Sequence, residues 1–131
     1  IRITDSIADG FSFFYAEVKC LKGLLRELGE PEELPLFYLI DEIFRGTNNR
    51  ERLIGSRAYI HTLLGANGAG LIATHDLELA RIPEKNPLAR NFHFRDDVSD
   101  GRLVFDYTLR AGPSPTTNAL RIMELEGLPI T

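Results

Sequence analysis

Two short apolar runs, each followed at once by acidic or titratable side chains, dominate the hydrophobic pattern of the chain. The first covers residues 35–40 and leads directly into Asp41 and Glu42. The second covers residues 70–74 and leads into His75. Uninterrupted apolar runs of this length are typical of strands that are buried on both faces of a parallel sheet. The pattern therefore predicts two such strands.

A helix is predicted between the two runs, over roughly residues 50–64. Asn48 is a favourable N-cap residue, and Glu51 stands three positions later, as in a capping box. Gly65 suits the end of the helix. A strand–helix–strand unit of this size normally places its two strands parallel, with a right-handed crossover. The polar residues that follow the two runs are therefore predicted to leave the sheet at the same edge.

Those polar residues are the candidate site, because ligands of open α/β sheets bind at the carboxyl ends of strands. Asp41 is a candidate magnesium ligand, and Glu42 is a candidate for orienting a water molecule toward a phosphate. The predicted topology places His75 beside them. Each feature also has an ordinary alternative. Adjacent acids often form a solvated turn, and a single histidine is more often a structural hydrogen-bonding residue.

The N-terminal part of the chain predicts a loop and then a long helix. Residues 4–11 are polar and contain a glycine, which favours a loop, and residues 12–28 have the spacing of an amphipathic helix. The hydrophobic residues on the predicted buried face are Phe14, Val18, Leu21, Leu25 and Leu28. One face of this helix is therefore expected to pack on the core.

The C-terminal part predicts mainly a β-hairpin. After a short helical turn at 77–80, residues 91–95 and 102–109 alternate as two strands joined by a turn over 96–101. A last helix is predicted from about residue 117 to residue 127. The aromatic residues of the hairpin are expected to lie in the core: Phe92, Phe94, Phe105 and Tyr107.

Composition restricts the classes of function. The 131 residues suffice for one domain with a core, and the net charge of −4 gives no electrostatic footprint for nucleic acid. Cys20 is the only cysteine, which excludes an internal disulfide and a cysteine-based zinc site. No apolar run reaches the length of a membrane span, and no signal peptide pattern is present. The cysteine count fits a reducing compartment, so we expect a cytoplasmic location. Because the chain begins with Ile1 rather than Met, we interpret it as a fragment of a larger protein.

Several segments resemble one family in the same order along the chain. Residues 39–43, Leu-Ile-Asp-Glu-Ile, followed by Arg-Gly-Thr at 45–47, resemble the Walker B segment and adjoining loop of the MutS family. That family comprises ABC-type ATPases best known from DNA mismatch repair. Residues 73–79, Ala-Thr-His-Asp-Leu-Glu-Leu, are similar to its switch-histidine segment. Residues 5–14 resemble its signature loop, and residues 111–129 resemble the segment that closes its ATPase domain.

The resemblance implies an α/β fold. Residues 1–131 would form the C-terminal part of a P-loop NTPase sheet of the ABC type, with mainly parallel strands, flanking helices and a C-terminal β-hairpin. The resemblance also implies roles for the residues at the rim of the sheet, the edge at which both predicted strands end. Asp41 would hold Mg²⁺, Glu42 would orient the attacking water, and His75 would contact the γ-phosphate of ATP and sense its loss.

Five further residues are implied as nucleotide-binding residues. Gly10 and Ser12, in the signature loop, would reach across a dimer interface to the nucleotide of the other subunit. Arg45, Gly46 and Thr47 would form the loop that links the two active sites. The alternatives are that Ser12 only caps a helix, that Gly10 only turns the chain, and that residues 45–47 are an ordinary strand-to-helix connection.

The implied function is ATP binding and hydrolysis in a composite site of a homodimer, with DNA bound by domains outside this segment. The 131 residues contain no G-x-x-x-x-G-K-[ST] loop, so the Walker A loop is expected upstream, and the chain alone is expected to be inactive. Asp9 and Phe13 stand where the family usually has Ser and Thr, and Phe44 stands where it usually has Gly. These differences leave open a non-catalytic nucleotide-binding or dimerisation module without a repair role. A third possibility is a phosphatase-like acid pair unrelated to NTPases.

Overall fold

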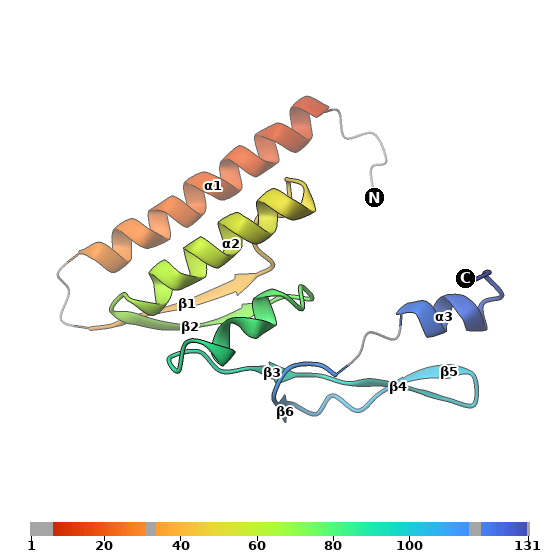
Figure 1. The fold of residues 1–131 in the computed structure, drawn as a ribbon. Helices are drawn as coiled ribbons and strands as arrows, with labels where there is room; N and C mark the ends of the chain where they lie inside the picture. Colours follow the sequence, from red (N-terminus) through yellow and green to blue (C-terminus); the bar gives the residue numbers. More distant parts are fainter. Residues whose placement is uncertain (1–6, 31–33, 116–118, 131) are drawn as a thin grey trace. The chain divides into compact units, whose positions relative to one another are not determined.

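The computed structural model describes residues 7–30, 34–115 and 119–130 of the chain (Figure 1). Two compact units are present, residues 1–82 and residues 83–131. Among the described helices, none is both long and apolar enough to cross a membrane.

The first unit contains the predicted strand–helix–strand arrangement. Helix α1 (Ile7–Gly29) is followed by strand β1 (Leu36–Asp41), helix α2 (Asn49–Leu64) and strand β2 (Gly68–Ala73). The two strands pair in parallel, with Leu36 opposite Gly68 at one end and Asp41 opposite Ala73 at the other. A short 3₁₀ helix, η1 (Leu79–Glu84), follows β2. The prediction of parallel strands joined by a helix is therefore confirmed.

Helices α1 and α2 lie side by side over one face of the β1–β2 sheet (Figure 1). The predicted apolar face of α1 is confirmed, because Leu21 and Leu28 are buried and the other members of the series are partly buried. Tyr59 of α2 is also buried, and its hydroxyl donates to the carbonyl oxygen of Leu21 at 2.6 Å. Burial raises the pKa of Tyr59 to about 12, which keeps the phenol protonated at this contact.

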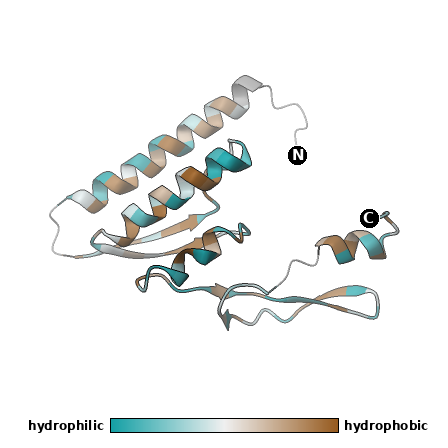
Figure 2. Ribbon diagram, viewed as in Figure 1, coloured by the Kyte–Doolittle hydropathy of each residue, from teal (hydrophilic) through white to brown (hydrophobic). Residues whose placement is uncertain are grey.

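The opposite face of the sheet is exposed. Along both strands, half-buried and exposed residues alternate, and Phe37, Leu39 and Leu71 are all more than half exposed. Parts of both strands are brown in Figure 2, which marks those parts as hydrophobic. The prediction that both faces are buried is therefore wrong for the described residues, because helices cover one face only.

The N-terminus of α2 has the predicted cap at Asn48, and the Glu51 carboxylate accepts from the Asn48 side chain rather than from its backbone N–H. The side chain of Asn48 accepts the backbone N–H of Glu51 at 2.9 Å, and Asn48 Nδ2 donates to the Glu51 carboxylate at 2.8 Å. Gly65 ends the helix at the predicted position. Local side-chain chemistry thus fixes the start of α2, and backbone hydrogen bonds from Gly65 accompany its end.

Replacing Asn48 by Ala is expected to lower the free energy of unfolding by about 1 kcal/mol, because one N–H of the first helical turn loses its acceptor. Chemical denaturation of the full-length protein measures this change. Replacing the neighbouring Asn49 by Ala is the matched control, and it is expected to have a smaller effect. Equal effects of the two substitutions would contradict the capping role.

Several boundaries before the C-terminal hairpin differ from the sequence prediction. Helix α1 begins at Ile7, so the predicted loop is wrong for residues 7–11, while residues 4–6 lie outside the described part. Gly10 lowers helix stability by only about 1 kcal/mol, which the adjoining turns can offset. Strand β2 begins at Gly68 rather than residue 70, and the helical turn after it lies at 79–84 rather than 77–80.

The second unit contains two antiparallel ladders and a short helix. Strand β3 (Phe92–His93) pairs with β6 (Arg110–Ala111), and β4 (Asp96–Ser99) pairs with β5 (Arg102–Phe105). Helix α3 (Ala119–Leu125) follows. A C-terminal hairpin is therefore confirmed, but its strands differ from the prediction. Residues 96–99 are a strand and not part of the turn, and residues 92–93 of the predicted first strand pair with residues 110–111. Among the described residues, one ladder is parallel and two are antiparallel. The α/β class is confirmed, but the prediction of mainly parallel strands is not.

The hairpin turn consists of Asp100 and Gly101, which both have positive φ (52° and 71°), as favoured in tight hairpins. After β5, the backbone N–H of Thr108 and the guanidinium of Arg110 hold the pKa of Asp106 below its usual range.

The prediction that the aromatic residues of the hairpin lie in the core is wrong. Phe92, Phe94, Phe105 and Tyr107 are all more than half exposed, because two-stranded ladders leave their faces uncovered within this unit.

Candidate functional site

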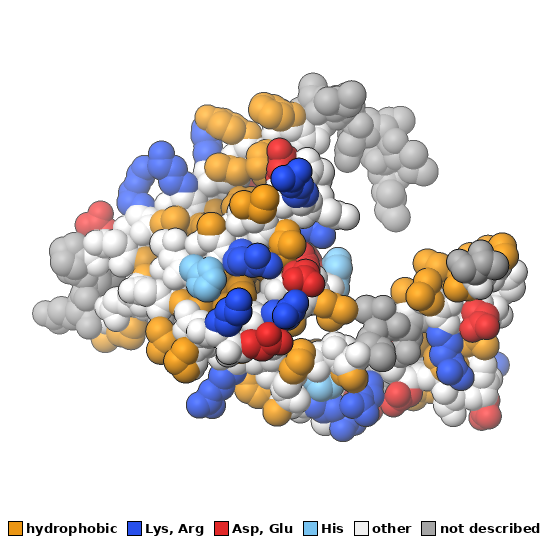
Figure 3. All heavy atoms as spheres, viewed as in Figure 1, with side chains coloured by type: hydrophobic (Ala, Val, Ile, Leu, Met, Phe, Trp, Pro, Cys, Tyr) orange, Lys and Arg blue, Asp and Glu red, His pale blue; other side chains and the backbone are white. Residues whose placement is uncertain are grey.

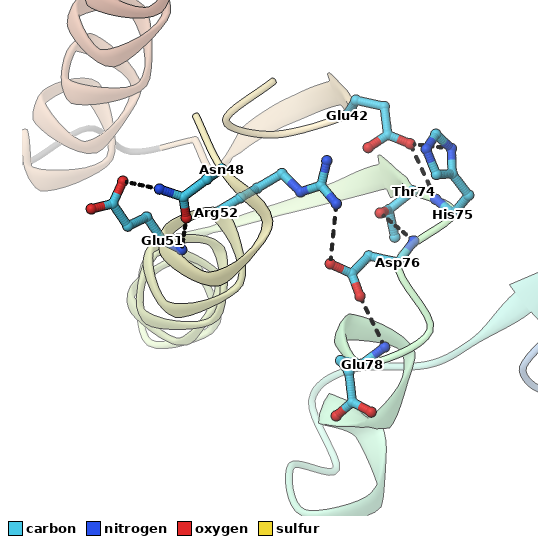
Figure 4. A network of polar contacts seen from close by, with 8 residues as sticks. All are labelled: Glu42, Asn48, Glu51, Arg52, Thr74, His75, Asp76 and Glu78. Atoms are coloured by element: carbon cyan, nitrogen blue, oxygen red, sulfur yellow. Dashed lines mark hydrogen bonds and ion pairs between the residues drawn. The ribbon is translucent and has the colours of Figure 1, made fainter. Parts of the chain in front are cut away.

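Glu42 and His75 meet where β1 and β2 end. The backbone N–H of Glu42 donates to the carbonyl oxygen of Ala73 at 2.9 Å, one residue beyond the last pair of the ladder. Glu42 Oε1 lies 2.8 Å from His75 Nδ1 and accepts the backbone N–H of His75 at 3.1 Å (Figure 4). The predicted convergence of these two residues at one rim of the sheet is therefore confirmed. Parallel pairing of their parent strands produces it.

The two partners differ in their exposure to solvent. The side chain of Glu42 is 17% exposed, whereas that of His75 is 84% exposed. A carboxylate that accepts from Nδ1 favours the tautomer with the proton on Nδ1, which leaves Nε2 available to a ligand. The pair therefore presents an oriented, accessible imidazole beside a largely shielded carboxylate.

The loop after β1 turns sharply. Glu42 and Phe44 have positive φ, 58° and 55°, on either side of Ile43, which is 1% exposed. Left-handed conformations of non-glycine residues are uncommon and cost about 1–3 kcal/mol each. The Phe44 ring lies 6.3 Å from the Phe14 ring and 6.2 Å from the Tyr59 ring. Burial of Ile43 and these ring contacts offset the strain.

Asp41, the predicted magnesium ligand, is adjacent to this loop and open to solvent. Its side chain is 86% exposed and lies 3.6 Å from the Arg45 guanidinium, which also donates to the Asp41 carbonyl oxygen at 2.8 Å. Among the described residues, no group of three or more acidic, histidine or cysteine side chains could form a metal cage. A single accessible carboxylate nevertheless fits Mg²⁺, which keeps several waters and takes one or two carboxylates together with phosphate oxygens. Arg45 is a competing cation at the same carboxylate.

Gly46 and Thr47 have local structural contacts. A Cβ added to Gly46 would lie 2.6 Å from Phe14 Cβ, so glycine allows the loop to approach α1 closely. The Thr47 hydroxyl donates to the Glu51 carboxylate at 2.9 Å, beside the cap of α2. The alternative of an ordinary strand-to-helix connection thus accounts for the contacts of these two residues.

Gly10 and Ser12 lie within α1 and not in a loop before it. Ser12 is the sixth residue of the helix, beyond the four N–H groups that a helix N-terminus leaves free. The predicted start of the helix at residue 12 is therefore wrong, and so is the alternative that Ser12 caps the helix. Both residues are exposed, and the contacts that join α1 to the rim are made one to two turns later, by Phe14 and Glu17.

Glu17 is a site residue that the sequence reasoning missed. Its carboxylate accepts the backbone N–H of Phe44 at 2.7 Å and that of Arg45 at 3.1 Å. A signal was present in the sequence, because Glu17 lies three residues after Phe14 and four before Leu21. It therefore places a charge on the apolar face of the helix.

The segment that follows His75 is fixed by a second polar cluster. Asp76 accepts the backbone N–H of Glu78 at 3.1 Å, its own backbone N–H donates to the Thr74 hydroxyl at 3.0 Å, and its carboxylate lies 4.0 Å from the Arg52 guanidinium (Figure 4). Arg57 of α2 lies 3.9 Å from Glu78. Figure 3 shows Lys and Arg side chains gathered over α2 and the neighbouring segment. These contacts tie the backbone around His75 to α2.

The comparisons with known proteins agree with one another on the family of the chain. A family profile described as MutS domain V matches residues 1–131. Two strains of Chloroflexus aurantiacus have a DNA mismatch repair protein MutS that is 34% identical to the chain, over 98% of the chain and 13% of the relative. The DNA mismatch repair protein MutS 2 of Halobacterium salinarum is 32% identical, over 98% of the chain and 15% of that protein. The chain thus spans about a seventh of the length of these relatives or less. It belongs to the MutS domain V family.

Proposed function

We propose that the chain supplies one rim of an ATPase site in a MutS-like DNA mismatch repair protein. The observation that carries the proposal is the contact between Glu42 and His75 at the carboxyl ends of two parallel strands. Open α/β sheets bind their ligands at this edge. The names of the relatives and the family match support the link to mismatch repair.

In this proposal, the two rim residues act on the terminal phosphate. Glu42 orients the water that attacks the γ-phosphate in line, and the exposed His75 ring contacts the γ-phosphate and responds to its loss. The 2.8 Å contact between them positions the ring before nucleotide binds. Bound Mg²⁺ would neutralise charge on the phosphates. Asp41 is the residue that would hold the ion through its exposed carboxylate, and Arg45 would have to release that carboxylate.

The remaining predicted binding residues belong to a wider proposal. Gly10 and Ser12 on α1 would reach the nucleotide of a second subunit, and Arg45, Gly46 and Thr47 would link the two sites of a homodimer. The Walker A loop would come from sequence before the chain, and DNA would bind to other domains. The exposure of Gly10 and Ser12 supports their availability to a partner.

A second candidate function is a nucleotide-binding or dimerisation module without turnover. One observation favours it. The signature segment from residue 7 onward is helical, and Ser12 lacks the free helix N-terminus that would bind a phosphate. Turnover in the intact protein separates the two candidates.

We expect the full-length protein to release phosphate from ATP only when Mg²⁺ is present, and we expect residues 1–131 alone to release essentially none. The sequence of the chain contains no Walker A loop to hold the phosphates, and Asp41 is a single carboxylate that holds a metal only together with phosphate oxygens. Phosphate release measured with Mg²⁺ and with excess EDTA tests both statements. A full-length protein without Mg²⁺-dependent turnover would overturn the ATPase proposal. Turnover by residues 1–131 alone would contradict the proposal that the Walker A loop must come from another part of the protein.

A further inference from the structure

We propose that Glu17 is a positioning residue for the Glu42–His75 pair. Its carboxylate holds the loop that follows Glu42 and so couples α1 to the rim of the sheet. The inference rests on the proposed function for its effect on turnover. The contact itself, however, is a property of the folded protein with or without nucleotide.

The Glu17 carboxylate occupies an anion-binding site that is formed by backbone N–H groups of the same chain. Two consecutive N–H groups, of Phe44 and Arg45, donate to the two different oxygens of the Glu17 carboxylate, at 2.7 and 3.1 Å. Consecutive N–H groups beside residues of positive φ form a concavity that binds anions. Here the anion is a side chain located 27 and 28 residues earlier in the sequence.

The Glu17 contact holds a residue of the loop that has an unfavourable backbone conformation. Phe44 has a φ of 55°, a conformation that glycine adopts freely and phenylalanine does not. Two residues earlier, Glu42 also has positive φ, and its carboxylate accepts the backbone N–H of His75 and lies 2.8 Å from His75 Nδ1. Release of Phe44 from Glu17 would let the loop relax, and Glu42 would move away from His75.

The contact also links two groups of proposed site residues. Gly10 and Ser12 lie on the same helix as Glu17, within two turns of it. A displacement of α1 would therefore reach Glu42 through one hydrogen-bonded carboxylate and the loop that it holds. Hydrogen-bond networks and packed side chains carry coupling of this kind, and the described contacts form such a network.

The test compares Glu17→Gln with Glu27→Gln in the full-length protein. Gln keeps the size of the side chain but offers one acceptor oxygen and turns an NH₂ group toward the second N–H. Glu27 is an exposed residue of the same helix, so its substitution makes the same change of charge without touching the loop. Glu17→Asp keeps the charge but shortens the reach, and should fall between Glu17→Gln and the unaltered protein.

Two readouts are measured, and only the first is independent of nucleotide. Hydrogen–deuterium exchange over residues 42–47 and 73–77 should become at least about 10-fold faster in Glu17→Gln, because the amides of Phe44, Arg45 and His75 lose protection. ATP turnover should fall by about 10- to 100-fold, with KM changed by less than about 3-fold, because the catalytic group is displaced while nucleotide binding persists. Glu27→Gln should change neither readout.

Each deviation has a distinct meaning. Unchanged exchange over residues 42–47 would overturn the inference, and so would faster exchange that stops at residues 42–47 and spares residues 73–77. If the unaltered protein is active and Glu17→Gln has the same turnover, the Glu17 contact is only structural. That result would also overturn the inference. An unaltered protein without turnover would refute the proposed function, and faster exchange in both segments would then still support positioning by Glu17.

Discussion

Replacement of Glu42 by Gln in the full-length protein is expected to lower ATP turnover by about 100-fold or more, the usual contribution of a positioned acid or base. Gln can still accept a hydrogen bond from His75, so the rim should keep its shape. It cannot take up a proton from water as a carboxylate does. ATP binding should therefore persist while phosphate release is lost. Steady-state phosphate release and equilibrium binding of ATP measure the two quantities separately.

Glu27→Gln is the control for this substitution, because it removes one negative charge at an exposed position of α1. It should leave turnover unchanged. If Glu42→Gln retained turnover within about twofold of the unaltered protein, Glu42 would not be the water-orienting group. The proposed role of Glu42 in catalysis would then be wrong, and only absence of turnover in the unaltered protein would favour the non-catalytic module.

The second large effect is expected on folding, from Gly70→Ala. A Cβ at this position would overlap the Tyr38 ring and lie 2.5 Å from the Tyr38 carbonyl oxygen. The oxygen belongs to the strand that pairs with β2, so it cannot move away without disturbing the parallel ladder. Overpacking of this kind costs about 1–3 kcal/mol. The midpoint of thermal denaturation should fall, and hydrogen exchange of the β1 and β2 amides should become faster.

Gly23→Ala is the matched control for Gly70→Ala. Gly23 lies inside α1, and a Cβ there would meet no atom within 4 Å. Alanine in a helix interior is favoured over glycine by about 0.5–1 kcal/mol, so this variant should be more stable than the unaltered protein. Destabilisation by both substitutions to the same extent would contradict the steric account of Gly70.

Elements defined by local chemistry were predictable from the sequence. The cap at Asn48, its partner Glu51 and the stop at Gly65 lie close along the chain, and the structure has all three. The parallel pairing of β1 and β2 follows from connection length, and it brought Glu42 and His75 to one edge as expected. The central pair of the candidate site could therefore be predicted before any coordinates.

Features that depend on distant contacts could not be predicted in the same way. The positive φ of Phe44 is stabilised by rings from α1 and α2 and by the Glu17 carboxylate, which no local pattern records. Hydrophobic patterning also does not specify what covers a residue. Leu39 reads as a core residue in the sequence, yet it is 69% exposed on the face of the sheet without helices.

The start of α1 was mispredicted for a related reason. Gly10 and polar neighbours are typical of loops, but their propensities are weak compared with the extension of an existing helix. The error matters for function, because it moves Gly10 and Ser12 from a presumed phosphate-binding loop onto the exposed surface of a helix.

The central claim is that the rim at the ends of β1 and β2 binds the terminal phosphate of ATP. The most direct measurement is an experimental structure of the full-length Glu42→Gln protein with ATP and Mg²⁺. The account predicts the γ-phosphate within hydrogen-bonding distance of the His75 ring, with a water between that phosphate and the side chain at position 42. A nucleotide bound elsewhere, with neither residue near a phosphate, would contradict it.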